Sequence, residues 1–132
     1  LSLPDRRYNE GPSMVDVMLQ LGTNLRNFRN SSSSIKDRRI AIIVSADLAH
    51  THQASGPYGY SPAAQPFDDA CAQWAQSLHA QPLLEEAKHL LNEAMSCGYV
   101  DLVVLHGALV ASQEVSGNAV KTDGWNCQLL SI

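Results

Sequence analysis

The stretch RIAIIVSADLAH, residues 39–50, decides the fold expected for this chain. Its first part, residues 39–45, is an almost continuous run of β-branched and apolar side chains. A strand of this kind is buried on both faces, as in the centre of a sheet that helices cover. The run therefore predicts a central strand, with Asp47 and His50 just beyond its carboxyl end.

Helical periodicity flanks the expected strand on both sides. Apolar side chains recur every three or four residues over 14–29, 67–78 and 83–95, and each of these patterns predicts a helix. Gly98 follows the last of them, where a helix C-cap is expected. A second apolar run, over residues 100–105, predicts another strand.

The order helix, strand, loop, helix, helix, strand predicts an α/β fold, a sandwich with a central mixed sheet covered by helices. Two strands alone make a poor sheet. The other strands are therefore expected either from sequence outside this chain or from a partner chain. The chain does not begin with Met, which favours the first source, so we expect an incomplete portion of a larger domain.

Composition excludes several classes of function. The 132 residues carry a formal net charge of −4, whereas a general nucleic-acid binder would carry a basic face. The three cysteines, Cys71, Cys97 and Cys127, are an odd number without zinc-knuckle spacing. A reducing, cytoplasmic location is therefore expected. The longest apolar run, residues 40–44, is too short to cross a bilayer, so a membrane is not an expected partner. Nucleic acid is not expected either, because of the negative net charge.

An irregular stretch follows the expected central strand, over residues 46–65. It is rich in Gly and Pro, contains two histidines, and places Tyr58 and Tyr60 among glycines. Long irregular loops in compact domains are usually functional or disordered. This composition favours an ordered, functional loop.

His50 is the best candidate for chemistry in that loop. Open α/β sheets bind ligands outside the carboxyl ends of their strands, and the topology puts His50 there. Imidazole is also the side chain best matched to proton transfer near neutral pH. Asp47, three residues earlier, could orient the ring or simply cap the loop.

Other uses of the histidines remain open. His50 and His52 could chelate a metal, since residues two apart share one face of an extended chain. His79 is expected at the C-terminal end of the second helix, and His89 on the surface of the third. His106 follows an expected strand, where we expect a hydrogen-bonded structural residue, the alternative being a side chain that points into a crevice. No HExxH, GxSxG, P-loop or GxGxxG motif occurs, so zincin, serine hydrolase and nucleotide-binding functions have no support.

Four motifs together point to a family: SADLAH at residues 45–50, GPYGY at 56–60, FD at 67–68 and LHGAL at 105–109. They resemble the catalytic-subunit (LigB-like) family of class III extradiol ring-cleavage dioxygenases. The resemblance covers residues 3–110, and SADLAH with the GPYG loop is its most specific part. It implies that the chain is the C-terminal part of a single LigB-like domain with an atypical tail.

That resemblance implies a non-haem Fe(II) oxidoreductase that opens an aromatic diol or aminophenol with O2. The family holds its iron with a 2-His-1-carboxylate triad. Its two iron histidines lie in the N-terminal half, which nothing here matches. His50 corresponds to the family's acid/base residue, which is not an iron ligand.

The resemblance also assigns the remaining site residues. Asp47, His52 and Tyr58 are expected beside the substrate. Glu93 is the best match to the carboxylate ligand of the metal. Cys97 is the runner-up, because a cysteine takes the metal position in the related Memo proteins; the residues alone favour a buried structural thiol at Cys97.

Two hypotheses follow for the function of the chain. The first is an extradiol dioxygenase fragment or subunit in catabolism of aromatic compounds, active only with its N-terminal half. The second is a non-catalytic, Memo-like binding or scaffold protein of the same fold. In either case we expect the chain to associate with the missing half or to form a homo-oligomer. A stand-alone hydrolase using His50 would lack a nucleophile.

Overall fold

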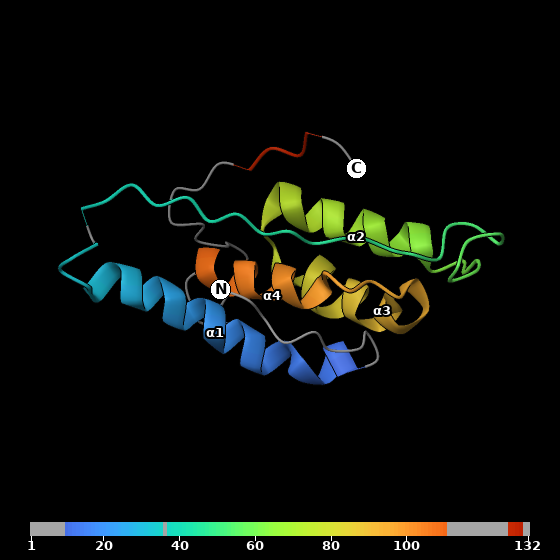
Figure 1. Ribbon diagram of the computed structural model, residues 1–132, viewed down its shortest axis with the longest axis horizontal. Helices are drawn as coiled ribbons and strands as arrows, with labels where there is room; N and C mark the ends of the chain where they lie inside the picture. The colour runs from blue at the N-terminus through green and yellow to red at the C-terminus, as the bar shows by residue number, and fades with distance from the viewer. Residues whose placement is uncertain (1–9, 36, 111–126, 131–132) are drawn as a thin grey trace.

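Helices make up the regular structure of the described part of the chain, which in this computed structural model is residues 10–35, 37–110 and 127–130. The elements, in chain order, are α1 (Gly11–Ser31), α2 (Ala64–Ser77), the π-helical turn η2 (Pro82–Ala87), α3 (Lys88–Ala94) and α4 (Tyr99–Leu109). Helix α4 lies between α1 and α2, and α3 and η2 lie beyond the start of α4 (Figure 1).

The three helices expected from periodicity are confirmed. Helix α1 contains the first pattern, α2 the second, and η2 with α3 the third. Their apolar faces meet in one core whose most deeply buried members include Phe67, Leu83, Leu91 and Val103. Periodicity located these helices well because each has one apolar face and one polar face.

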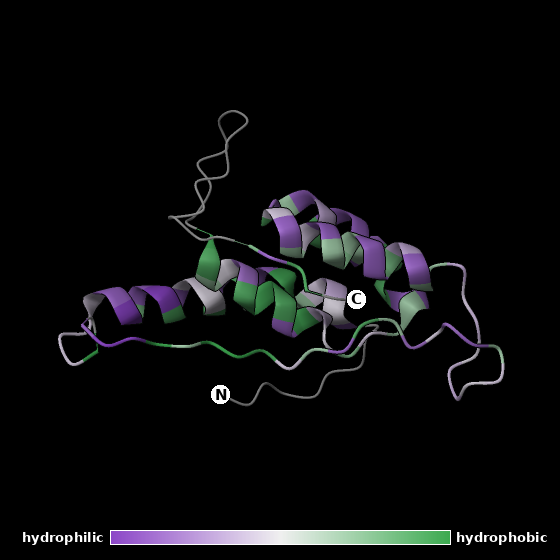
Figure 2. Ribbon diagram, turned by 90° about the horizontal axis from the view of Figure 1, so that it is seen from above, coloured by the Kyte–Doolittle hydropathy of each residue, from purple (hydrophilic) through white to green (hydrophobic). Residues whose placement is uncertain are grey.

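The expected strand over residues 100–105 is wrong, because these residues lie in α4. This helix is apolar on nearly all sides and packs between two other helices, so it has no polar stripe (Figure 2). A short apolar run without a polar face cannot be told from a buried strand by periodicity. The expected C-cap at Gly98 is wrong as well. Met95 ends α3 with a left-handed backbone (φ 56°), and Gly98 instead precedes α4 as its N-cap.

The expected α/β sandwich is also wrong for the described residues, which form no sheet. Residues 39–49 do run as an extended segment along the length of the molecule (Figure 1), but no described strand pairs with them. The only bridge among the described residues joins His52 and Tyr60. Ile40, Ile42 and Ile43 are accordingly exposed. An apolar extended segment becomes a sheet strand only when neighbouring backbone supplies its hydrogen bonds.

Helices α1 and α4 cross at two glycines. A Cβ added to Gly22 would lie 2.1 Å from the carbonyl oxygen of Val104, and one added to Gly107 would lie 2.4 Å from that of Leu19. Real Cβ atoms do not approach backbone so closely, so both positions need glycine. The contact brings α4 into the core and fixes where the turn before it lies.

A buried hydrogen bond joins α2 to α4. The indole Nε1–H of Trp74 donates to Nδ1 of His106 over 3.0 Å. Burial lowers the pKa of His106 to about 4, so the ring is neutral and its remaining proton is on Nε2. His106 is thus a hydrogen-bonded structural residue as expected, but in a helix.

Replacing Gly22 by Ala should destabilise the fold by about 1–3 kcal/mol, because the new Cβ overlaps backbone atoms of α4 that cannot move independently. Urea unfolding followed by circular dichroism measures this change. Asn24→Ala, at an exposed position of the same helix, is the matched control and should leave stability nearly unchanged. Equal midpoints for the two variants would contradict the close crossing.

Stability should fall as the pH drops below neutral, because His106 binds a proton in the unfolded chain near pH 6.5 but in the folded chain only near pH 4. From pH 7 to pH 5 this linkage removes on the order of 1–2 kcal/mol from the free energy of unfolding. His106→Asn, whose amide oxygen can accept from Trp74, should flatten the dependence. His89→Gln, on the exposed surface of α3, should not. Urea titrations at the two pH values decide between these outcomes.

Candidate functional site

The candidate site forms where two segments far apart in sequence touch. Ala46 and Asp47 pack directly on Gly98, where an added Cβ would lie 2.5 Å from the Asp47 nitrogen and 2.6 Å from the Ala46 Cα. The hydroxyl of Ser96 donates to the carbonyl of Asp47 over 2.9 Å. Only glycine permits this approach, and its consequence is that Asp47 lies beside Cys97.

The next residues of the loop cap the end of α3. The backbone N–H of His50 donates to the carbonyl of Ala94 over 2.9 Å, and the hydroxyl of Thr51 donates to that of Glu93 over 2.9 Å. The last carbonyls of a helix have no partner within it. The loop supplies partners for two of them, and this fixes the backbone of His50 at the end of α3.

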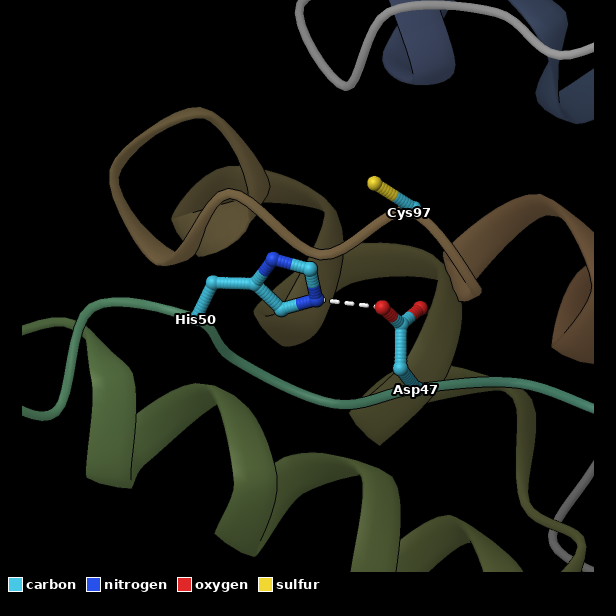
Figure 3. Close-up of side chains that lie close together, drawn as sticks. All are labelled: Asp47, His50 and Cys97. Atoms are coloured by element: carbon cyan, nitrogen blue, oxygen red, sulfur yellow. Dashed lines mark hydrogen bonds and ion pairs between the residues drawn. The ribbon is translucent and has the colours of Figure 1, made fainter. Parts of the chain in front are cut away.

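The ring of His50 is held between a carboxylate and an aromatic ring. Its Nε2 is hydrogen-bonded to Oδ2 of Asp47, as Figure 3 shows. The ring centroid of Tyr58 lies 4.8 Å away, with the two rings tilted by 60°. The other nitrogen, Nδ1, makes no hydrogen bond within the described residues. With its Nε2–H directed at Asp47, the ring would keep Nδ1 as a proton acceptor for a ligand.

Three side chains here could hold a cation. The ligand atoms of Asp47, His50 and Cys97 all lie within 4.8 Å of one another (Figure 3). Asp101, at the start of α4, adds a further acidic group. Its pKa is raised, first by burial and second by the charge of Asp47, because the two carboxyl groups lie near enough to repel each other when both are ionised. A cation bound between such groups would relieve that repulsion.

The donor set decides which cation these residues suit. An oxygen, a nitrogen and a sulfur ligand fit a borderline divalent metal such as Zn²⁺ or Fe²⁺ better than Mg²⁺ or Ca²⁺, which prefer oxygen alone. A 2-His-1-carboxylate triad needs two imidazoles, whereas the described residues bring one imidazole to this cluster, that of His50, which the resemblance assigns to acid/base chemistry and not to the metal. The side chains left for the metal are those of Asp47 and Cys97, so the described residues fit only part of such a site.

The sequence-predicted residues divide into two groups. Asp47, His50 and Tyr58 come together, and Cys97 joins them. His52 turns instead toward Asp68, with its Nε2 2.7 Å from Oδ2 of that residue. None of their roles is tested by this arrangement, and each role stays a prediction.

Glu93, expected as the metal carboxylate, lies exposed near the end of α3. Its carboxylate accepts from the hydroxyl of Ser61 over 3.4 Å, and it does not belong to the cation cluster. Its role as a ligand also stays a prediction. Sequence reasoning gave no role to Asp68 or Ser96. The signal for Asp68 was its place in the FD motif, next to an apolar residue on the buried face of a helix.

Comparison with known protein families gives a match. A family model described as the catalytic LigB subunit of aromatic ring-opening dioxygenase matches residues 12–131. A search of curated proteins returned no match. Most of the tail that was expected to be atypical, residues 112–132, lies outside the described residues. Among the helices of the described ranges, none has both the length and the hydropathy to cross a bilayer.

The cation cluster predicts a spectroscopic result. Co²⁺ added to the anaerobic, reduced protein should give thiolate-to-cobalt charge-transfer absorption in the near ultraviolet. Cys97→Ala should abolish that band and weaken Co²⁺ binding at least about tenfold. Cys127→Ala, which removes another exposed thiol, is the control. A band that survives in Cys97→Ala and disappears in Cys127→Ala would place the metal elsewhere.

Proposed function

The chain belongs to the family of LigB catalytic subunits of aromatic ring-opening dioxygenases, and from this we propose that it carries the acid/base half of an extradiol dioxygenase site. The proposed substrate class is a catechol or an aminophenol, opened with O2. The observation that carries the proposal is the placement of His50. Its ring is fixed by Asp47, adjoins Tyr58, and lies beside side chains that can hold a metal.

In the proposed reaction, His50 accepts a proton from a substrate hydroxyl and returns a proton to the opening ring. Asp47 supports this by accepting from Nε2–H, which fixes the tautomer and leaves Nδ1 as the base. A charged carboxylate next to the ring also stabilises the imidazolium that forms when His50 takes the proton. Asp47 thus orients His50, and His50 moves the proton.

Tyr58 supports an aromatic substrate. Its ring is half exposed and adjoins His50, so a planar substrate could lie against it while one hydroxyl reaches the imidazole. Aromatic rings pair through offset or tilted contacts, which this surface offers. A second aromatic residue, Tyr60, is exposed on the same loop.

Fe(II) is the proposed metal, and when bound it would hold the diol and O2 together for reaction. Cys97 and Asp47 are the ligands that this chain offers beside the His50 ring. The imidazoles of a complete triad would come from outside the described residues. In this arrangement His50 stays off the metal and remains able to exchange protons.

His50→Gln should lower the rate of ring opening by about 10²–10⁴-fold, the usual contribution of a general acid/base, while metal binding stays within about threefold of wild type. The intact protein, loaded anaerobically with Fe(II), is assayed with a panel of catechols and aminophenols by the absorbance of the ring-opened product. His89→Gln, exposed on α3, is the matched control.

Two results would count against the proposal. Loss of the metal in His50→Gln would make His50 a ligand and remove its acid/base role. Absence of ring-opened product from the Fe(II)-loaded wild type with every diol and aminophenol would favour a non-catalytic binding protein of this family.

A further inference from the structure

A buried carboxylate lies behind the loop that carries His50. Asp68 is in the second turn of α2 and is 5% exposed. A buried charge is costly unless hydrogen bonds or a counter-charge compensate it. The hydrogen-bond partners of Asp68 show which groups compensate its buried charge.

Both oxygens of Asp68 bind the loop, one on each side of His50. Oδ1 accepts from the backbone N–H of Ala49 over 2.9 Å, and Oδ2 lies 2.7 Å from Nε2 of His52. Ala49 precedes His50 and His52 follows it by two residues. One carboxylate thus fixes the chain immediately before and shortly after the candidate acid/base residue.

The opposite side of the same segment is held by another helix. The N–H of His50 and the hydroxyl of Thr51 donate to carbonyls at the end of α3. Of the consecutive residues from Ala49 to His52, the first and the last are therefore tied to α2, and the two between them to α3. With its backbone fixed from two sides, the ring of His50 is directed toward Asp47 and Tyr58.

We propose that Asp68 is a positioning residue for His50, acting through the Ala49 amide and the His52 ring. The inference rests on the proposed function insofar as it concerns catalysis. Within the described residues, Asp68 makes no hydrogen bond to the His50 ring itself; it binds the loop on either side of that ring. Its effect is to hold the loop backbone so that the His50 ring stays in hydrogen-bond contact with Asp47, because small displacements of a reacting group slow catalysis strongly.

The chemistry of Asp68 fits this task. An ionised carboxylate offers only acceptors, and both of its partners here present N–H groups, with His52 donating through Nε2. The carboxylate also acts on the neighbouring thiol of Cys71, whose pKa is raised to about 12, first by burial and second by the charge of Asp68. An asparagine could still accept from the Ala49 amide with its oxygen, whereas an alanine could accept nothing.

The test compares Asp68→Ala with Asp68→Asn in the intact protein. Asp69→Ala is the matched control, because Asp69 is the exposed neighbour in the same helix turn and its carboxylate accepts a hydrogen bond from Gln65 of the same helix. NMR measures the amide hydrogen exchange of Ala49 and the ring resonances of His50. The ring-opening assay measures kcat and KM on the same variants.

In Asp68→Ala, exchange of the Ala49 amide should accelerate at least about tenfold and the His50 ring resonances should move, with kcat lower by about 10–100-fold and KM within about threefold of wild type. Asp68→Asn should recover most of the Ala49 protection and part of kcat. Asp69→Ala should match wild type in every measurement.

Three outcomes separate the claims. Unchanged Ala49 exchange and His50 resonances in Asp68→Ala would overturn the positioning role, whatever the activity. Equal losses of kcat in Asp68→Ala and Asp69→Ala would also overturn it. A wild type without ring-opening activity would defeat the proposed function, while the NMR measurements would still decide whether Asp68 positions His50.

Discussion

The site depends on one close contact between two backbones. Ala46 and Asp47 lie against Gly98, at a distance that no side chain larger than hydrogen allows. This contact joins a loop and a turn about fifty residues apart in sequence, and it brings a carboxylate, an imidazole and a thiol to the same place. Gly98 is also the N-cap of α4. The packing of α4 on α1 therefore determines the position of the turn before α4, which carries Cys97.

Hydrogen bonds between the helices and the irregular loop hold the loop around His50 in place. The loop around His50 has no sheet to hold it, so the helices supply its partners: carbonyls at the end of α3 on one side and Asp68 of α2 on the other. An arrangement of this kind fixes a side chain as firmly as a strand end would, but each bond must be made individually. The polar residues next to His50 are therefore as much a part of the site as the ring itself.

Sequence reasoning predicted α1, α2 and the η2–α3 segment because each has an apolar face at helical spacing. It failed for residues 100–105, where an apolar run buried on all sides gives no period, and for residues 39–45, an apolar run that is extended but that no described strand pairs with. The Asp47–His50 pair could be predicted because its members are only three positions apart in the sequence. The approach of Cys97 and the role of Asp68 could not, since both arise from tertiary contacts across 16 to 50 positions of the sequence.

The extended segment that precedes the site has a consequence for the behaviour of the protein in solution. Ile43 is 91% exposed, and residues 40–44 offer apolar side chains on a backbone that no described strand pairs with. Such an edge recruits other strands, and in a crowded solution it is a nucleus for aggregation. Charged residues flank this apolar run, with Arg38 and Arg39 before it and Asp47 after it. Charges at the ends of an apolar strand oppose its stacking into fibrils.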